Sequence, residues 1–283
     1  MRIAAVHRSG ADLPALVDPA RGVVTLKSLG LEVASALELV EDADLLARAT
    51  GLAASASDDA FLDPDSLEYA APYRRPHKIW GIGLNYRDHA ADLSEEAPDQ
   101  PASFIKADHT VCGQCDSIVV PRQSQRTTAE GELGLVIGTL CRDVDEAHAL
   151  EHVWGVTTIL DQTAEDILRM NPRFLTRSKN FPTFFCFGPE LVPLAEVLDE
   201  SGALDSLEVS TVVNGTDVRT NTVAHMTHRP EALIAFHSQM MPLYPGDIIS
   251  TGTPGAIVVD DGDEVECRIP RVGALRTTVV RQR

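Results

Sequence analysis

The chain has 283 residues, of which 44% are hydrophobic, and it carries a formal net charge of −18 at neutral pH. This length is sufficient for one large domain, or for one large and one small domain. The acidic balance argues against nucleic acid or an anionic membrane surface as a partner, although a metal ion or a few basic side chains could still attract an anionic substrate.

The expected location is the cytoplasm. No apolar run approaches the roughly 18 residues of a membrane span, and the N-terminus lacks the apolar segment of a signal peptide. The five cysteines are an odd number in a long chain, which is typical of reduced thiols. Cys112 and Cys115 form a CxxC pair. No second pair and no paired His follow at zinc-finger spacing, so we interpret them as turn thiols.

Residues 1–72 are predicted to form a small N-terminal α/β domain with a structural role, and residues 73–283 a larger domain. The elements expected in the small domain are strands at 3–7 and 22–26 and helices at 33–40 and 43–49, the second ended by Gly51. The segment 53–67 is rich in Ala, Ser, Asp and Pro, which predicts a linker.

A mobile flap is predicted over residues 86–101. The stretch from Arg87 to Leu93 can form a short helix, which would place His89 and Asp92 on one face. A His with a carboxylate partner is a usable general base, because the acid orients the ring and raises its basicity. An incidental pair on a surface helix is the alternative. The polar, Pro-containing segment that follows is typical of a flap that closes over a site.

Two carboxylates, Glu130 and Glu132, lie directly before an apolar run that predicts a strand. Because side chains alternate along a strand, both point to one face, where they repel each other unless a cation or a proton holds them. A solvated edge strand is the alternative for this pair alone. Asp161 follows the apolar run 156–160, so it is expected at a strand end, beside a helix that begins in a capping box at 163–166. Three oxygen ligands favour Mg²⁺, then Mn²⁺ or Ca²⁺.

Two later segments could contact an anionic substrate. Lys179 stands in the segment 177–189, which holds four of the eight Phe residues, so it is either snorkelling or functional. Beside a metal it could bind a carboxylate or stabilise an enolate. A strand near residue 248 ends in a Gly- and Thr-rich turn at 251–255, whose amides and hydroxyls could receive a carboxylate. An ordinary turn is the alternative.

Short strands dominate the rest of the chain. Asn214 and Gly215 predict a hairpin turn, and Pro230 opens a helix that continues to about residue 239. Further strands are expected at 104–106, 117–121, 265–270 and 275–280. Many strands, short turns and few long helices predict an α+β fold dominated by β-structure.

Taken together, these segments resemble the fumarylacetoacetate hydrolase family. The matching motifs follow the family's order from about Arg75 to Gly273. They are Ile82–Ala90, Glu130-x-Glu132-Leu133 with Val136–Gly138, Asp161, Lys179 before Phe-rich sequence and Gly188-Pro189, Val213–Gly215, and Pro245–Pro254. The resemblance implies the family's rolled mixed β-sheet domain, a smaller N-terminal domain and a homodimer.

The resemblance also implies roles for individual residues, with a 2-oxo or 1,3-diketo acid chelating Mg²⁺ or Mn²⁺. The implied metal ligands are Glu130, Glu132 and Asp161. The implied catalytic residues are Lys179 and the water-activating His89 with Asp92. The expected substrate-binding residues are Tyr86, Arg87, Gly252 and Thr253.

Four positions depart from the family pattern. They are Asp92 for a usual Glu, Glu165 for Arg, Thr220 for Gln and Pro182 for Asp. The expected reaction is hydrolysis of a C–C bond in a 1,3-diketo acid or acylpyruvate through a metal-stabilised enolate. An oxaloacetate-type decarboxylase, a 2-oxo-acid isomerase or hydratase, and a non-catalytic protein whose metal holds the fold are the alternatives.

Overall fold

A computed structural model describes residues 1–87 and 98–283 of the chain. His89 and Asp92, and most of the predicted flap, therefore lie outside the described residues.

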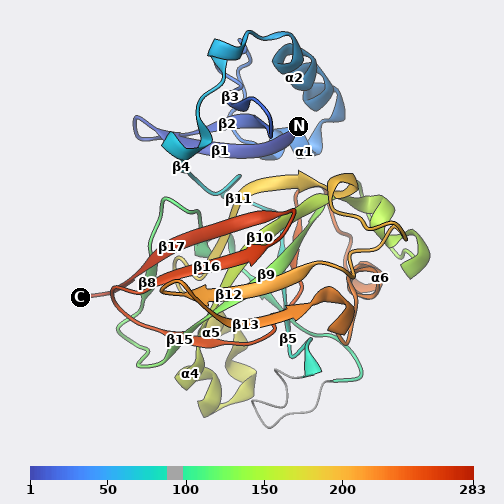
Figure 1. Cartoon of the computed structure of the whole chain (residues 1–283). Coiled ribbons are helices and arrows are strands. Elements are labelled where there is room, and N and C mark those ends of the chain that lie inside the picture. Colours follow the sequence, from blue (N-terminus) through green and yellow to red (C-terminus); the bar gives the residue numbers. More distant parts are fainter. Residues whose placement is uncertain (88–97) are drawn as a thin grey trace.

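The larger of two sheets runs through the whole length of the molecule (Figure 1). Among the described residues it has twelve strands, in the order β3-β2-β1-β11-β10-β9-β14-β5-β6, with β15 on β9, β4 on β1 and β7 on β11. Their bounds are β1 Arg2–Arg8, β2 Ala11–Asp18, β3 Gly22–Thr25, β4 Glu68–Tyr69, β5 Ile79–Gly83, β6 Ala102–Lys106, β7 Val111–Cys112, β9 Thr127–Ile137, β10 Val153–Ala164, β11 Phe185–Pro193, β14 Ile248–Ser250 and β15 Ile257–Val259.

A second sheet packs over the central strands of the first. Its five described strands are β8 Ile118–Val120, β12 Glu208–Val213, β13 Thr216–Thr222, β16 Glu264–Ile269 and β17 Gly273–Arg281, in the order β13-β12-β16-β17-β8. The described α-helices are short: α1 Leu37–Glu41, α2 Ala43–Ser55, α4 Glu165–Met170, α5 Leu175–Lys179 and α6 Pro230–Met240. The β-dominated α+β fold predicted from the sequence is confirmed.

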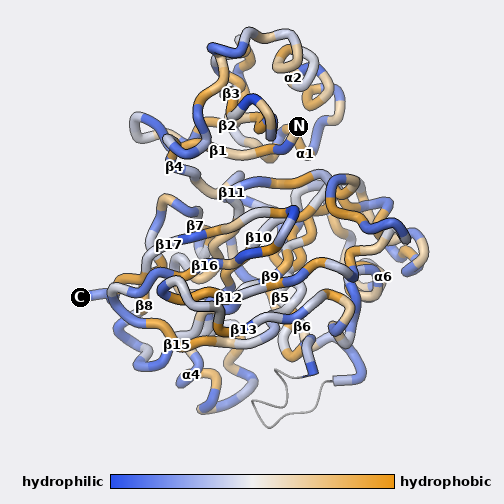
Figure 2. Tube along the Cα trace, in the orientation of Figure 1, coloured by the Kyte–Doolittle hydropathy of each residue, from blue (hydrophilic) through white to orange (hydrophobic). Residues whose placement is uncertain are grey.

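Strand β9 lies at the centre of the core, and all eleven of its residues are buried. Its middle glycine, Gly131, allows the second sheet to approach, because a Cβ there would lie 2.7 Å from Thr211 Oγ1. The Gly131 amide donates a hydrogen bond of 2.9 Å to the same hydroxyl. Figure 2 shows apolar stretches along the central strands and polar segments mainly in the peripheral turns. Any charged residue on β9 is therefore held inside the protein.

The N-terminal elements continue the large sheet. Strand β1 pairs with β11, so that Ile3 lies opposite Leu191, and the two parts share a hydrophobic cluster. The expected strands at 3–7 and 22–26 are present. The strand β2 between them was not predicted, because Pro14 interrupts its pattern. The domain boundary near residue 72 stays a prediction.

Two details of this N-terminal part correct the sequence interpretation. Helix α2 passes Gly51 and ends at Ser55, while α1 begins only at Leu37. The predicted linker at 53–67 contains the end of α2 and two 3-10 turns that pack beside β3, where Val23 bonds to Leu62. In the part of the chain that the structure describes, no helix is long and apolar enough to cross a membrane.

Candidate metal centre

The centre of the site is set by the register of β9 and β10. These strands are antiparallel, and Glu130 lies directly opposite Asp161. Glu132 follows on the same face of β9, so the ligand atoms of the three carboxylates lie within 4.8 Å of one another. All three side chains are buried. The same-face arrangement of the two glutamates and the closeness of Asp161 agree with the sequence prediction.

The surroundings of Asp161 differ from that prediction in two respects. Strand β10 continues to Ala164, so Asp161 lies within the strand and not at its end. Helix α4 begins at Glu165 and has no side-chain cap, so the predicted capping box at 163–166 is wrong. The Thr163 hydroxyl is used elsewhere, because it donates a hydrogen bond of 2.7 Å to Glu130 Oε1.

Each glutamate is oriented by hydroxyl or amide donors. Glu130 Oε1 also accepts a hydrogen bond of 3.0 Å from the hydroxyl of Thr128, two residues earlier on β9. Glu132 Oε2 accepts from the Ser250 hydroxyl at 2.5 Å and from the Gly252 amide at 2.8 Å. These donors leave the other oxygen of each carboxylate directed into the group. Burial, reinforced by the charge of Asp161, raises the pKa of Glu132 to about 8.

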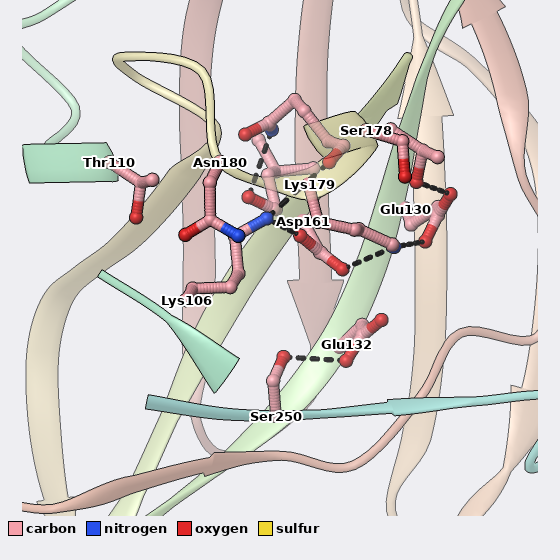
Figure 3. Close-up of polar contacts among 12 residues, drawn as sticks. Lys106, Thr110, Glu130, Glu132, Asp161, Ser178, Lys179, Asn180 and Ser250 are labelled. Atoms are coloured by element: carbon pink, nitrogen blue, oxygen red, sulfur yellow. Dashed lines mark hydrogen bonds and ion pairs between the residues drawn. The ribbon is translucent and has the colours of Figure 1, made fainter. Parts of the chain in front are cut away.

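Two lysines meet at these carboxylates (Figure 3). Lys179, the last residue of α5, has its Nζ 2.9 Å from Glu130 Oε2 and 2.6 Å from Asp161 Oδ2. Its Nζ also lies 4.8 Å from the centre of the Phe104 ring. Burial by itself would lower the pKa of Lys179, but Asp161 and the two glutamates raise it, so the side chain is an ammonium. The Lys179 ammonium thus lies among the carboxylates and does not extend to solvent.

Lys106 is a site residue that the sequence interpretation missed. It ends β6, is buried, and forms an ion pair with Asp161 Oδ1 and a hydrogen bond of 3.4 Å to the Gln162 carbonyl. The alternation of β6 contains the signal, because Lys106 shares a face with the buried Phe104 two residues earlier. Asp161 is thus held by a different lysine on each oxygen.

The donor set fits a hard divalent cation. Three carboxylates supply oxygen ligands, and the described group contains no Cys or His. The hydroxyl and amide donors fix the carboxylate orientations, as expected around metal ligands. The ammonium of Lys179 and a divalent cation would together compensate the three buried negative charges.

The four expected substrate-binding residues lie in three places. The Tyr86 ring is buried in the core, and its hydroxyl, near Glu132, has no hydrogen-bond partner among the described residues. Arg87 is exposed, at the end of the first described range. Gly252 reaches Glu132 through its amide, and Thr253, which is 4% exposed, lies next to it in the same turn. The structure thus brings Gly252 of the turn into contact with the candidate metal centre.

Two of the residues that depart from the family pattern, Glu165 and Thr220, contact nearby side chains. Glu165 pairs with Arg126 and, at 2.7 Å, with Arg169. The Thr220 hydroxyl bonds to that of Ser210 at 3.0 Å. Neither contact includes one of the three carboxylates.

Comparisons with known proteins found a family model and relatives that match this chain. Residues 78–280 match the model of the fumarylacetoacetate hydrolase C-terminal domain. The human mitochondrial oxaloacetate tautomerase FAHD2A is 35% identical over 228 residues, which cover 77% of this chain and 71% of that protein.

Two solved structures cover the whole chain and are themselves fully covered. A maleylpyruvate hydrolase from Sphingobium sp. SYK-6, in complex with manganese (II) and pyruvate, has a TM-score of 0.82 and 25% identity. A 5-carboxymethyl-2-hydroxymuconate delta-isomerase from Mycobacterium smegmatis has a TM-score of 0.75 and 28% identity. Tautomerases, hydrolases and isomerases are thus among the relatives. With most of its length matched by the family model, this chain belongs to the fumarylacetoacetate hydrolase family.

Proposed function

We propose that this protein is a divalent-metal-dependent enzyme that interconverts the keto and enol forms of a 2-oxo acid, with oxaloacetate as the first candidate. The observation that carries the proposal is Lys179, whose ammonium contacts two carboxylates of the buried group. An ammonium in this position can stabilise an enolate, because it places positive charge where negative charge develops in the reaction. The identity with the human oxaloacetate tautomerase supports the choice of substrate.

The reaction moves one proton. A base removes a proton from C3 of the keto acid, the C2–C3 bond becomes double, and the C2 oxygen takes up a proton. A bound Mg²⁺ or Mn²⁺, held by Glu130, Glu132 and Asp161, would supply Lewis-acid polarisation of the 2-oxo group. Lys179 donates a hydrogen bond to the developing oxyanion. The Thr253 hydroxyl, which donates to the Gly255 carbonyl in the free protein, turns to donate to the substrate carboxylate. We assign the base to His89, held by Asp92.

An assay of oxaloacetate enolisation tests the proposal. The protein should accelerate the approach to keto–enol equilibrium with Mg²⁺ or Mn²⁺, and excess EDTA should remove that rate. Lys179→Met should lower the metal-dependent rate by about 100-fold or more, the effect of losing one oxyanion donor. Lys27→Met, which removes an exposed lysine elsewhere, should leave it unchanged. Equal rates for the wild type and Lys179→Met, with circular dichroism confirming both folds, would disprove the assignment.

Hydrolysis of the C–C bond of an acylpyruvate, the reaction predicted from the sequence, is the second candidate. The structural similarity to the maleylpyruvate hydrolase favours it. It requires a water molecule activated by His89, and Asp92 is shorter by one methylene than the usual Glu. If this is the reaction, pyruvate should be released from acylpyruvates, His89→Ala should abolish the release, and Asp92→Glu should maintain or raise it. Absence of pyruvate release from every acylpyruvate tested would exclude hydrolysis.

A further inference from the structure

A cavity lies where the N-terminal elements meet the rest of the chain. We propose that this cavity is a second ligand site, separate from the metal centre, and that its ligand is a flat apolar molecule with one carboxylate. None of the residues that line the cavity belongs to the three carboxylates or to their hydrogen-bond donors. The ligand of the cavity is therefore not the substrate of the metal centre.

The cavity has a volume of about 350 Å³, which is within the range of small-molecule sites. Strands β1 and β2 line one part of it, at Ala5, Asp12 and Pro14. The segment 34–37, which leads into α1, and the segment 71–75, between β4 and β5, line the remainder. Figure 1 shows β1 and α1 on the side of the N-terminal elements that faces the rest of the molecule. The cavity is therefore built by the N-terminal part and by its connection to the larger part.

The lining of the cavity is held in place by contacts outside it. Tyr73 is buried, and its hydroxyl donates a hydrogen bond of 2.9 Å to the Gly246 carbonyl. Leu37 packs on the same glycine, because a Cβ at position 246 would lie 2.1 Å from Leu37 Cδ1. The Ser35 amide donates to Glu38 Oε1 at 3.0 Å. Since these lining residues are fixed before a ligand binds, binding requires little ordering of the protein.

Small apolar side chains leave the space inside the cavity. Its lining includes four alanines and two prolines, with Leu37 and the Tyr73 ring as the larger apolar groups. An apolar cavity of about 150 Å³ accommodates one benzene ring. A volume of about 350 Å³ therefore has room for two fused rings and a carboxylate. Water gains few hydrogen bonds from such walls, so an apolar ligand displaces it favourably.

The charged residues of the lining favour an anion. Arg74 Nε donates to Asp12 Oδ2 at 2.7 Å, and its Nη1 donates to Asp116 Oδ2 at 3.0 Å. The other oxygen of Asp12 lies 2.7 Å from His7 Nδ1, so both oxygens of this lining acid already have partners. Arg75 is exposed and has no ion-pair or hydrogen-bond partner among the described residues. Its guanidinium is the charge left for a ligand, and its planar donors match a carboxylate.

Calorimetry with 2-naphthoate tests the site on the full-length protein, loaded with Mn²⁺ and saturated with oxalate, which occupies the metal centre. 2-Naphthoate should bind one molecule per chain with a Kd of about 1 mM or below, and it should bind equally in EDTA. The neutral 2-naphthamide, which has the same shape, should bind roughly tenfold or more weakly. Arg75→Gln should reduce the affinity for 2-naphthoate to that for 2-naphthamide, because the cation is lost, and should leave Mn²⁺ affinity unchanged.

Filling the cavity is the second test. Ala34 is an exposed residue of the lining, so Ala34→Phe should place a ring in the cavity and abolish the binding of both compounds. The matched controls are Ala47→Phe and Arg48→Gln, at exposed positions of α2 outside the lining. Both controls should bind 2-naphthoate as the wild type does, and circular dichroism should confirm that every variant is folded.

Four results would overturn the second site. Absence of 2-naphthoate binding, or its loss when oxalate is added, would leave the metal centre as the only site for the compound. Equal affinities of 2-naphthoate and 2-naphthamide, or of the wild type and Arg75→Gln for 2-naphthoate, would show that Arg75 selects no anion. Binding that persists in Ala34→Phe would place the compound outside the cavity.

Discussion

The three buried carboxylates are stabilised because each accepts hydrogen bonds or ion pairs from its own set of donor groups. Glu130 has two threonine hydroxyls and Lys179, Glu132 has Ser250 and the Gly252 amide, and Asp161 has two lysines. Unpaired charges would be expensive in such a place, and the pKa of Glu132 near 8 reflects this cost. The site therefore combines three candidate metal ligands with a set of residues that fix their positions.

The first prediction at this scale concerns Glu132→Gln. The substitution removes one metal ligand but keeps the side-chain shape. Loss of a residue that only orients a metal ligand lowers metal affinity by up to about 100-fold, so loss of a ligand itself should lower Mn²⁺ affinity by at least that much. Stability in EDTA at neutral pH should not decrease, because the raised pKa of Glu132 favours its neutral form, which Gln resembles. Calorimetry and urea unfolding measure both quantities. Glu264→Gln, an exposed acid on β16, is the control, and unchanged Mn²⁺ affinity in Glu132→Gln would contradict the ligand assignment.

The second prediction concerns Lys106→Met. Breaking the buried pair with Asp161 should lower the free energy of unfolding in EDTA by about 3–5 kcal/mol. Saturating Mn²⁺ should restore much of this loss, because the ion supplies positive charge to the folded state alone. Lys78→Met is the matched control, since Lys78 pairs at 2.6 Å with the buried Asp247. Its loss of stability should be no smaller with Mn²⁺ than without. If Mn²⁺ changed the free energy of unfolding equally in both variants, Lys106 would not belong to the metal site.

At the scale of elements, local pattern predicts some strands well and others not at all. The apolar run after Glu132 and the Asn214–Gly215 turn both gave correct elements, because a continuous apolar run and a turn with positive φ at both positions are local properties. Strand β11 was missed because Pro189 and Pro193 fall in an aromatic segment that reads as irregular. Its pairing with β1 and β10 depends on residues far away in sequence, which no local pattern contains.

The same limit applies to the candidate site. Acidic residues beside apolar runs could be recognised from the sequence, and family motifs joined Asp161 and Lys179 to them. The roles of Thr163 and Ser250 could not be predicted from the sequence. The hydrogen-bond partner of a hydroxyl is set by the register of the strands and not by its neighbours in the chain. For Lys106, the alternation along β6 predicts that the side chain is on the buried face of the strand, but it does not predict Asp161 as the partner.

A prediction at this scale concerns two glycines of the turn after β14. Gly252 has φ +97°, and a Cβ there would meet Asn85 Cβ at 2.8 Å and the Ile82 carbonyl at 3.1 Å. Gly252→Ala should therefore lower stability by about 1–3 kcal/mol and weaken Mn²⁺ binding, as its amide moves away from Glu132. Gly255→Ala meets the movable stem of Arg219, so it should cost less and spare Mn²⁺ binding. Urea unfolding and calorimetry check both, and equal effects of the two substitutions would contradict this account.

At the scale of the whole molecule, the N-terminal part and the metal centre belong to one sheet. A chain that begins at residue 73 would lose β1 and expose the edge of β11 together with the cluster around Phe185 and Phe187. We predict that it is less stable and aggregates, because an open apolar edge invites pairing with other chains. Differential scanning calorimetry and light scattering should show a lower melting temperature and large particles. A monodisperse shortened chain with unchanged melting temperature would instead identify residues 1–72 as an independent unit.

The family resemblance also predicts a homodimer. Light scattering at micromolar concentration should give twice the mass of one 30.6 kDa chain. A mass equal to one chain would show that this protein departs from the family in its assembly.

The central position of the carboxylates has a consequence for the exchange of amide hydrogens and for evolution. Strands β9 and β10 are paired on both sides, so their amides should exchange with solvent only when the whole molecule unfolds, whereas the β12–β13 hairpin at the sheet edge should exchange through local opening. The chemistry of the metal centre is thus tied to global stability, and its residues can change only at a high cost. Changes in the hairpin at the sheet edge should cost less stability than changes at the metal centre. The relatives matched to this chain include an isomerase, a hydrolase and a tautomerase.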